Sequence, residues 1–537
     1  MERIALISVF HKEGIVDFAG QLVGMGWNII ASGNTARVLV EAGIPVKDVA
    51  EIVGGGAILG HRVVTLSREI HAGLLARDNK EDNAELSRLG ILRIDLVCVD
   101  LYPLEAEIAK TNSTLESVIE KTDIGGPTML RSAAKGRRIV ICDPADRQKV
   151  IEWLKIGEPN REEFISVLVA KAEGMVANYV LASARYQSHG SIDGFIGHET
   201  LRCKYGENAW QTPARLFANL GNNDPLAIHN FTLIVGTVPS FNNLVDLERL
   251  LQTMTHISAA FRLNRNGYIP WIALAAKHGN CCGAAVGSDQ IEVIKKMIDG
   301  DQIAIFGGVV LTNFSFSDER AETLMTYKMP EGKRRLLDAI AAPMFSEKSV
   351  ELFKRKGDKC RLLANGALID IPYDLDKENR FRYVRGGFLV QPNYTFVLNL
   401  FDPDIAKYGD ILKLAEALDA IMLGWGVGST GNSNTITVCQ KDHMIGNAVS
   451  QQSRVGACKL AKLRTESSGH DPRGSVAYSD SFFPETDGPE ELANMGVGVI
   501  FTSSGSVKDK EVIDYCLKNG IAVMMIPDAK GRGFFGH

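Results

Sequence analysis

The chain has 537 residues, of which 45% are hydrophobic and 23% charged, and its net charge is −5 at pH 7. This composition is that of a globular protein, and a length of about 150 residues per domain predicts two to four folding units. A negative net charge gives no overall positive potential that would attract nucleic acid. The sequence has no run of 18 or more apolar residues, so we expect no membrane-spanning helix. The nine cysteines form no C-x-x-C pair. We therefore expect a cytoplasmic protein with no secretory signal and no metal site.

The first 150 residues alternate short apolar runs with helical patterns. The predicted strands are residues 4–9, 28–31, 96–101 and 138–142. This alternation predicts a parallel sheet covered on both faces by helices. A long helical segment over residues 162–186 closes this half, and the glycine-containing stretch 188–198 is the predicted junction.

The second half also predicts an α/β structure. Its strand signals lie at residues 271–276, 304–312, 387–390, 435–439, 497–502 and 521–526, with helices at 411–422 and 451–463. We expect more than one sheet here, because about 340 residues exceed one comfortable core.

Two N-terminal strands end in serine-containing turns, at residues 8–12 and 32–35. In an open parallel sheet, ligands bind beyond the carboxyl ends of the strands, and helix N-termini with hydroxyl groups suit a phosphate. Serine and threonine also cap helices, and the pattern alone does not separate the two roles.

Several separated motifs follow in order through residues 3–190. They are residues 32–36, 60–63, 70–77, 100–103, 123–131 and 133–135. Together they resemble the inosine monophosphate (IMP) cyclohydrolase domain of the bifunctional purine-biosynthesis family, which implies a methylglyoxal-synthase-like fold. The resemblance implies closure of formylated AICAR (FAICAR) to IMP with loss of water. Catalysis would come from positioning of the reacting groups, proton transfer and stabilisation of the oxyanion.

By this resemblance the predicted catalytic residues are Tyr102, Asp123 and Lys135. The predicted nucleotide- and phosphate-binding residues are Ser8, Lys12, Ser32, Gly33, Thr35, Arg62 and Thr65. The chain departs from the family pattern at Val64, which replaces the usual active-site lysine. Valine donates no hydrogen bond and carries no charge. Losing one donor to an oxyanion lowers a rate by about 10²–10³-fold.

Lys277 and His278 follow an apolar run at residues 272–276 and precede a stretch of small residues. A polar pair at the carboxyl end of a strand is typical of a ligand site, although a lone histidine there is more often structural.

Further motifs follow in order from residue 205 to the end of the chain. They are residues 205–208, 240–243, 306–310, 341–343, 386–391, 433–434, 451–454, 479–484, 487–488 and 535–537. With residues 277–283 they resemble the AICAR formyltransferase domain, which implies two cytidine-deaminase-like α/β subdomains. The likeness to deaminases is one of fold, because the zinc signature is absent and no catalytic metal is expected.

The implied reaction moves the formyl group of 10-formyltetrahydrofolate, the expected co-substrate, to the 5-amino group of AICAR. By resemblance, His278 is the base, Lys277 stabilises the oxyanion or assists the leaving group, and Asn434 orients the formyl group. The predicted substrate-binding residues are Lys204, Tyr205 and Arg454, and the predicted folate-binding residues are Phe482, Phe483 and Asp487.

The predicted organisation is a cyclohydrolase domain over residues 1–190, a linker over 191–200 and a formyltransferase domain over 201–537. The family implies a homodimer with small-molecule substrates and without nucleic-acid or membrane partners. One alternative is a formyltransferase only, whose N-terminal domain is a degenerate or regulatory nucleotide-binding module, as Val64 suggests. A second is a binding scaffold without turnover.

Overall fold

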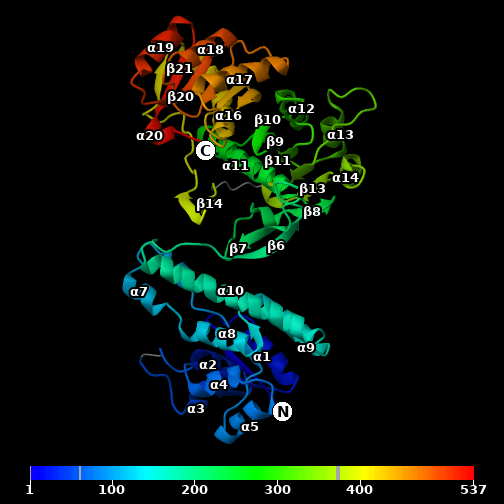
Figure 1. Cartoon of the computed structure of the whole chain (residues 1–537), viewed down its shortest axis with the longest axis vertical. Helices are drawn as coiled ribbons and strands as arrows, with labels where there is room; N and C mark the ends of the chain where they lie inside the picture. Colours follow the sequence, from blue (N-terminus) through cyan, green and yellow to red (C-terminus); the bar gives the residue numbers. More distant parts are fainter. Residues whose placement is uncertain (1, 60–61, 370–374, 537) are drawn as a thin grey trace. The chain divides into compact units, whose positions relative to one another are not determined.

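The computed structural model describes residues 2–59, 62–369 and 375–536 (Figure 1). The chain forms two compact units. One contains residues 1–198 and 218–222, and the other contains residues 199–217 and 223–537. A two-stranded sheet of β6 (Gly197–Cys203) and β7 (Ala214–Asn219) lies where the chain passes between them.

The N-terminal unit is built on a five-stranded sheet in the order β3-β2-β1-β4-β5, and all four pairings are parallel. Its strands are β1 (Arg3–Ser8), β2 (Trp27–Ala31), β3 (Val46–Asp48), β4 (Leu96–Val99) and β5 (Ile139–Ile141). Every residue of β4 and β5 is buried. Consecutive strand residues point to opposite faces, so both faces are covered, and the predicted parallel sheet is confirmed. The strand order reverses between β1 and β4, which is where such sheets bind ligands.

Ten α-helices of the described chain surround this sheet. They are α1 (Ile15–Gly24), α2 (Gly33–Glu41), α3 (Val49–Ile52), α4 (Arg68–Leu75), α5 (Lys80–Leu89), α6 (Leu104–Ile108), α7 (Leu115–Glu120), α8 (Gly125–Lys135), α9 (Arg147–Lys155) and α10 (Arg161–Gln187). Among the described residues, α10 is long and apolar enough to cross a membrane by length and composition alone. It packs against α8, α6 and β5 through a face that includes Leu168 and Val176, whereas Val167 and Val180 are exposed.

One mixed sheet of twelve strands runs through the C-terminal unit, in the order β16-β21-β20-β19-β17-β18-β10-β9-β11-β12-β13-β8. These strands are β8 (Thr232–Val235), β9 (Trp271–Lys277), β10 (Asn280–Gly287), β11 (Val309–Thr312), β12 (Ala339–Ala342), β13 (Arg361–Ala364), β16 (Ala406–Tyr408), β17 (Ile436–Gln440), β18 (His443–Ala448), β19 (Val476–Ser479), β20 (Val499–Ser504) and β21 (Ala522–Pro527). Antiparallel pairing of β10 with β18 joins the two halves of the unit into this one sheet, so the expected additional sheet is not a second main sheet. The further sheet within this unit is a hairpin of β14 (Asn379–Val384) and β15 (Gly387–Pro392).

The two halves of the large sheet have the same topology. One half has the order β10-β9-β11-β12-β13 and the other β18-β17-β19-β20-β21, so each consists of an antiparallel hairpin followed by three parallel strands. This repeat agrees with the two predicted subdomains. The predicted strand at 304–312 begins only at Val309, since residues 304–308 form turns in which Gly307 has a φ of 75°.

Ten α-helices of the described residues belong to this unit, and several of them contact strands on either side of the β10–β18 pairing. They are α11 (Phe241–Asn264), α12 (Gln290–Gly300), α13 (Asp318–Thr326), α14 (Glu347–Phe353), α15 (Ile411–Glu416), α16 (Leu418–Gly428), α17 (Arg454–Ser467), α18 (Asp487–Met495), α19 (Asp509–Lys518) and α20 (Asp528–Gly531). Every residue of α16 from Ala420 to Gly428 is buried, and α16 packs on α11. These two helices therefore form the centre of the unit.

We expect mild acid to destabilise the C-terminal unit through His256 on α11. The side chain is fully buried, and its ring nitrogens face the carbonyl oxygens of Gln252 at 2.7 Å and Tyr394 at 3.2 Å. Burial outweighs both carbonyls and lowers the pKa of His256 from 6.5 to about 4. The neutral ring thus contributes stability that is present above pH 6.5 and is lost as the pH falls toward 4, by about 3 kcal/mol.

Thermal melts of wild type and His256→Asn between pH 7 and 4 check this prediction. The variant should begin less stable at pH 7 and should lose less stability on acidification. Parallel losses in the two proteins would contradict the role of His256.

Candidate active sites

The carboxyl ends of β1 and β2 bring four predicted phosphate-binding residues together. The hydroxyl oxygens of Ser8 and Ser32 lie 2.6 Å apart, and Lys12 Nζ lies 3.2 Å from Thr35 Oγ1. In the described part of the chain, the Ser32 side chain makes no capping hydrogen bond to α2, which begins at Gly33. The first N–H groups of α2 are therefore available to a phosphate, beside a partly buried ammonium group.

Asp100, which sequence reasoning did not single out, joins the loops after β1 and β4. Its carboxylate accepts hydrogen bonds from the backbone N–H groups of Phe10 and His11, and the His11 ring lies 3.3 Å away. The Phe10 ring in turn contacts the ring of Tyr102 with centroids 5.6 Å apart. A charged residue within the apolar run at residues 96–101 was the available sequence signal.

Asp123, Tyr102 and Thr65 meet at the start of α8. The Asp123 carboxylate accepts from Gly126 N at 2.8 Å and from the backbone of Tyr102. A side chain on Gly126 would lie 2.4 Å from Asp123 Oδ2, and one on Gly125 would lie 2.7 Å from Thr65 Oγ1, so both positions require glycine. Burial raises the pKa of Asp123, and burial together with Asp123 raises the pKa of Tyr102.

Two predicted residues lie apart from this group. Lys135 is exposed at the far end of α8, about 15 Å along the helix from Gly125. The geometry within one chain therefore does not support its placement beside Asp123. Arg62 is exposed and forms an ion pair with Glu120. Gly60 and His61 of the 60–63 motif lie outside the described residues.

Val64 is half-buried and packs against the hydrophobic core of the N-terminal unit. Arg68 is exposed and lies 3.5 Å from Glu69. The described ion pair of Arg68 therefore does not point to a replacement for the missing lysine.

In the C-terminal unit, Lys277 and Asn280 pair across a two-residue turn formed by His278 and Gly279. Both turn residues have positive φ, 56° and 70°, which is the geometry of a type I′ hairpin. Asp246 on α11 accepts a hydrogen bond from Gly279 N at 2.5 Å, and its charge also interacts with His278. Lys277 Nζ donates to Phe306 O at 2.6 Å, in the turn that precedes β11. The exposed imidazole of His278 therefore stands on a fixed backbone.

Sheet register brings Asn434 to the same edge as His278. Asn447 Nδ2 donates to Cys281 O at 2.9 Å, so β18 ends beside the turn between β9 and β10. Ile436, at the start of β17, pairs with Ala448 and with Ser479. The start of β17 and the ends of β18 and β19 thus lie at the same end of the strands as the turn that carries His278. We call this end of the sheet the hairpin edge.

Asn434 lies at this edge just before β17. It exchanges backbone hydrogen bonds with Gln451, and its side-chain Nδ2 donates to Gln451 O at 2.8 Å. Its side-chain oxygen is therefore the group that can face a substrate.

Arg454, at the start of α17 on the hairpin edge, forms a buried ion pair with Asp480 at the end of β19. Breaking a buried pair costs about 3–5 kcal/mol, because the remaining charge is left without compensation. Lost activity in an Arg454 variant would therefore not by itself identify a phosphate contact. Asp480 was not predicted, although the charged residue following a buried strand was a signal.

The three residues predicted to bind folate differ in their exposure. Phe483 is 1% exposed and lies in a core cluster, where a side chain on Gly488 would come within 2.7 Å of its ring. Its prediction as a pterin contact is not supported, because packing already surrounds it. Phe482 is half-buried and Asp487 is exposed at the start of α18, so both remain accessible.

Lys204 and Tyr205 are attached by their backbones to the start of α11, through Pro239 and Phe241. Lys204 is exposed and Tyr205 half-buried. His537 of the predicted C-terminal motif lies outside the described residues. Among those described, no group of three or more His, Cys, Asp or Glu side chains is placed to hold a metal.

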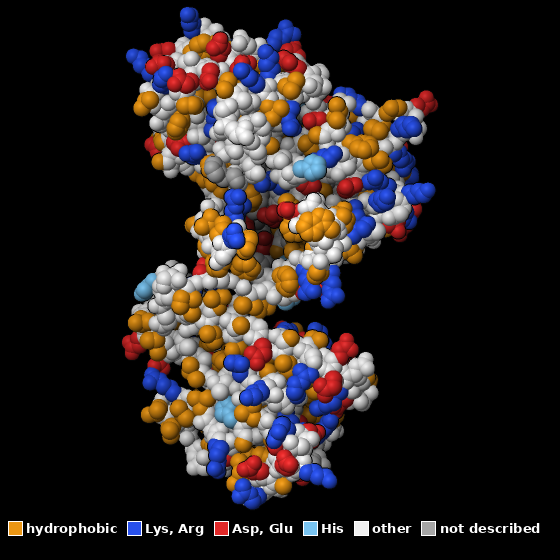
Figure 2. Space-filling view, viewed as in Figure 1, with side chains coloured by type: hydrophobic (Ala, Val, Ile, Leu, Met, Phe, Trp, Pro, Cys, Tyr) orange, Lys and Arg blue, Asp and Glu red, His pale blue; other side chains and the backbone are white. Residues whose placement is uncertain are grey.

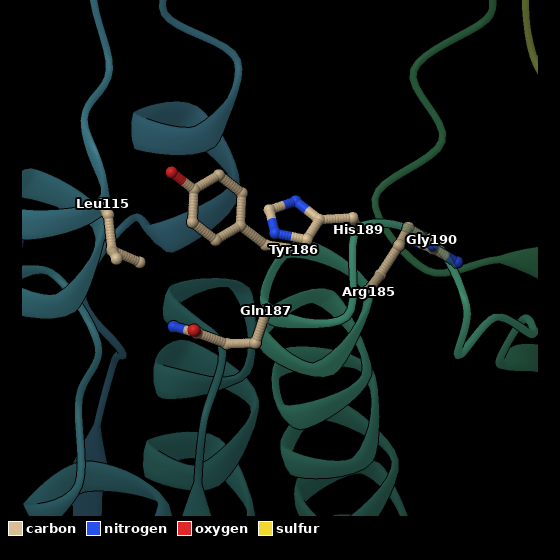
Figure 3. Close-up of a pocket in the computed structure, with 6 residues that line it drawn as sticks. All are labelled: Leu115, Arg185, Tyr186, Gln187, His189 and Gly190. Carbon is tan, nitrogen blue, oxygen red and sulfur yellow. The ribbon is translucent and has the colours of Figure 1, made fainter.

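A cavity of about 480 Å³ lies elsewhere, at the end of α10 (Figure 3). It is lined by Leu115, Arg185, Tyr186, Gln187, His189 and Gly190. Arg185 is already paired with Asp193 at 2.6 Å. The cavity shares no residue with the predicted sites.

Comparisons with known proteins concern the chain as a whole and not single site residues. The family model described as AICARFT/IMPCHase bienzyme matches residues 133–464, which is more than half of the chain, and an MGS-like domain model matches residues 14–128. The bifunctional purine biosynthesis protein PurH of Anoxybacillus flavithermus is 35% identical over 98% of this chain and 98% of that protein. The chain belongs to the AICARFT/IMPCHase bienzyme family.

Other members of the family show the same full-length similarity. The PurH proteins of Lysinibacillus sphaericus and Halalkalibacterium halodurans are 33% and 34% identical, each over 98% of both chains. A solved structure described as the crystal structure of ForH is 32% identical and covers 36% of this chain and 100% of that chain, with a TM-score of 0.33. Membership in the AICARFT/IMPCHase bienzyme family confirms the resemblance, the fold class and the bifunctional enzyme class predicted from sequence.

Proposed function

We propose that the chain catalyses the last two steps of purine synthesis, each in its own unit. Formyl transfer from 10-formyltetrahydrofolate to AICAR takes place at the hairpin edge, and closure of FAICAR to IMP takes place beyond β1, β2 and β4. The convergence of Lys277, His278 and Asn434 at one sheet edge carries the proposal. Residues 1–190 and 201–537 are the corresponding domains.

In the formyl transfer, the 5-amino nitrogen of AICAR attacks the formyl carbon. His278 accepts the proton that the nitrogen loses, and the Lys277 ammonium stabilises the oxyanion. The bond between the formyl carbon and N10 of the folate then breaks, and N10 takes up a proton. Lys277 has three donors and uses one on Phe306 O, so donors remain for the oxyanion. Phe482 and Asp487 are the accessible candidates for the pterin, and Lys204, Tyr205 and Arg454 remain the candidates for AICAR.

In the cyclisation, the carboxamide nitrogen of FAICAR attacks the formyl carbon, and water leaves after ring closure. Asp123, whose pKa burial raises, accepts the carboxamide proton, and the Tyr102 hydroxyl donates to the oxyanion. Ser8, Lys12, Ser32, Gly33 and Thr35 would hold the nucleotide phosphate at the start of α2.

Supplying AICAR and 10-formyltetrahydrofolate to the intact protein tests the proposal. We expect IMP to form, with FAICAR as an intermediate. Accumulation of FAICAR without IMP would instead support a formyltransferase with a degenerate N-terminal domain, and ligand binding without turnover would support a scaffold. Full-length similarity to proteins named bifunctional favours the two-step activity.

Val64→Lys should raise the rate of FAICAR cyclisation. Val64 lies in the segment between Arg62 and Thr65, where a lysine would add one donor for the oxyanion, an interaction worth about 10²–10³-fold. Val64→Met is the matched control, because methionine has a bulk similar to that of lysine but carries no charge. Stopped-flow absorbance with FAICAR measures the effect. Equal rates for the two variants would show that this position does not limit cyclisation.

We also propose a cytoplasmic homodimer. Apolar side chains gather on the β14–β15 hairpin, where Tyr383 is 81% and Leu389 60% exposed (Figure 2). An isolated two-stranded hairpin is marginally stable in water, so a covering partner surface is expected. Sedimentation equilibrium of wild type and of Tyr383→Ser/Leu389→Ser tests this, with a shift toward monomer expected in the variant.

A further inference from the structure

One turn of α11 contacts both catalytic segments of the hairpin edge. Asp246 accepts from Gly279 N in the turn that carries His278. Arg249 follows three residues later, so it lies on the same face of the helix, and its Nη2 lies 3.2 Å from Asn432 Oδ1. Asn432 precedes Asn434 by two residues. The helix therefore connects the half of the sheet that carries His278 with the half that carries Asn434.

The C-terminal segment completes this connection. Phe535 N donates to Gly431 O at 2.8 Å, and Ser433 N donates to Gly536 O at 3.1 Å, so the segment lies along the loop that leads to Asn434. A Cβ at residue 536 would lie 2.3 Å from Asn432 Oδ1, so glycine leaves room at this position for the Asn432 side chain.

Two guanidinium groups hold the ring of Phe535. Arg249 lies over the ring at 4.7 Å from its centroid, and Arg380 of β14 lies at 3.5 Å and also donates to the Phe535 carbonyl. Burial lowers the pKa of Arg249 to about 10, which leaves the group charged at neutral pH. A partly desolvated cation on an aromatic face is a strong contact.

Arg249 also keeps an unused donor. Its Nη1 is buried and has no hydrogen-bond partner among the described residues. Buried nitrogens without a partner are uncommon in native structures.

We propose that Arg249 is a positioning residue for formyl transfer. It holds the Gly431–Asn434 loop and the Phe535–Gly536 segment in register with the His278 turn, so that the base and the formyl-orienting amide face one substrate. The inference rests on the proposed formyltransferase function. It assigns Arg249 no contact with the reacting atoms.

Arg249→Met tests the proposal, with Arg262→Met as the matched control, because Arg262 is an exposed arginine on the same helix. Steady-state kinetics of formyl transfer should show kcat about 10²-fold lower, since a misplacement near 1 Å has this effect, with KM for AICAR changed less than kcat. Cyclisation of supplied FAICAR should be unchanged, because it takes place in the other unit, and a thermal melt reports whether the C-terminal unit is folded. Guanidinium ion added to Arg249→Ala should restore part of kcat.

A double-mutant cycle separates positioning from independent packing. If Arg249 acts through Asn434, Arg249→Met/Asn434→Ala should be no slower than Asn434→Ala alone. An unchanged kcat in Arg249→Met, or effects that multiply in the double variant, would overturn the inference. If Arg249→Met fails to fold, Phe535→Leu replaces it in the same cycle, because it removes the ring that both arginines contact. Wild type without formyl transfer would overturn the proposed function as well.

Discussion

His278→Asn is expected to lower kcat for formyl transfer by about 10²–10⁴-fold, the usual contribution of a general base. Asparagine is the informative replacement because residue 278 has a φ of 56°, and asparagine tolerates the left-handed conformation better than most residues. The turn should therefore keep its shape while it loses the group that accepts the proton of the AICAR amine.

The repeated topology supplies a control for this experiment. Lys441 occupies the corresponding turn between β17 and β18 with a φ of 55°, at the opposite edge of the sheet. Lys441→Asn should leave both activities unchanged, and FAICAR cyclisation should be unchanged in both variants. If His278→Asn retained formyl transfer within a few-fold of wild type, His278 would not be the base.

Asp123→Asn is expected to lower kcat for FAICAR cyclisation by a similar factor, about 10²–10⁴-fold. The amide oxygen can still accept the hydrogen bond from Gly126 N that starts α8, so the variant removes the base with little change in the backbone. Formyl transfer, in the other unit, should continue and FAICAR should accumulate.

The pH dependence of cyclisation gives a second measurement on Asp123. Burial raises the pKa of this carboxyl above 3.8, and only its ionised form accepts a proton. The wild-type rate should therefore rise with pH through an acid limb that lies above pH 3.8, and the limb should be absent from the residual rate of Asp123→Asn. An acid limb that is identical in both proteins would assign it to another group.

Four strands of the N-terminal sheet were predictable because each is a short run of mostly buried apolar residues, whereas β3, with the sequence Val-Lys-Asp and no buried residue, was not predicted. The motifs also identified Asp123, Tyr102 and Thr65, which the fold brings to one turn. The placement of Lys135 was not predictable in the same way. A motif fixes spacing along the chain, whereas a helix converts that spacing into a distance of about 15 Å.

In the C-terminal unit, the motifs identified His278, Lys277 and Asn434, but they did not show how residues more than 150 positions apart could meet. The pairing of β10 with β18 brings these residues together. It joins the two halves of the unit, each of which begins with an antiparallel hairpin, in one sheet and aligns the ends of their strands. Such pairing depends on long-range hydrogen bonds that leave no local pattern in the sequence.

The sequence by itself determined the family and the two activities, and it predicted the groups at both sites, because those depend on residue types in a fixed order. Only the tertiary structure decided which of these groups are free to act. It placed Phe483 in the core, paired Arg454 with Asp480, and showed that Asp246 and Arg249 hydrogen-bond to Gly279 and Asn432. Burial and pairing arise from neighbours that are distant along the chain, and they determine whether a side chain can meet a substrate.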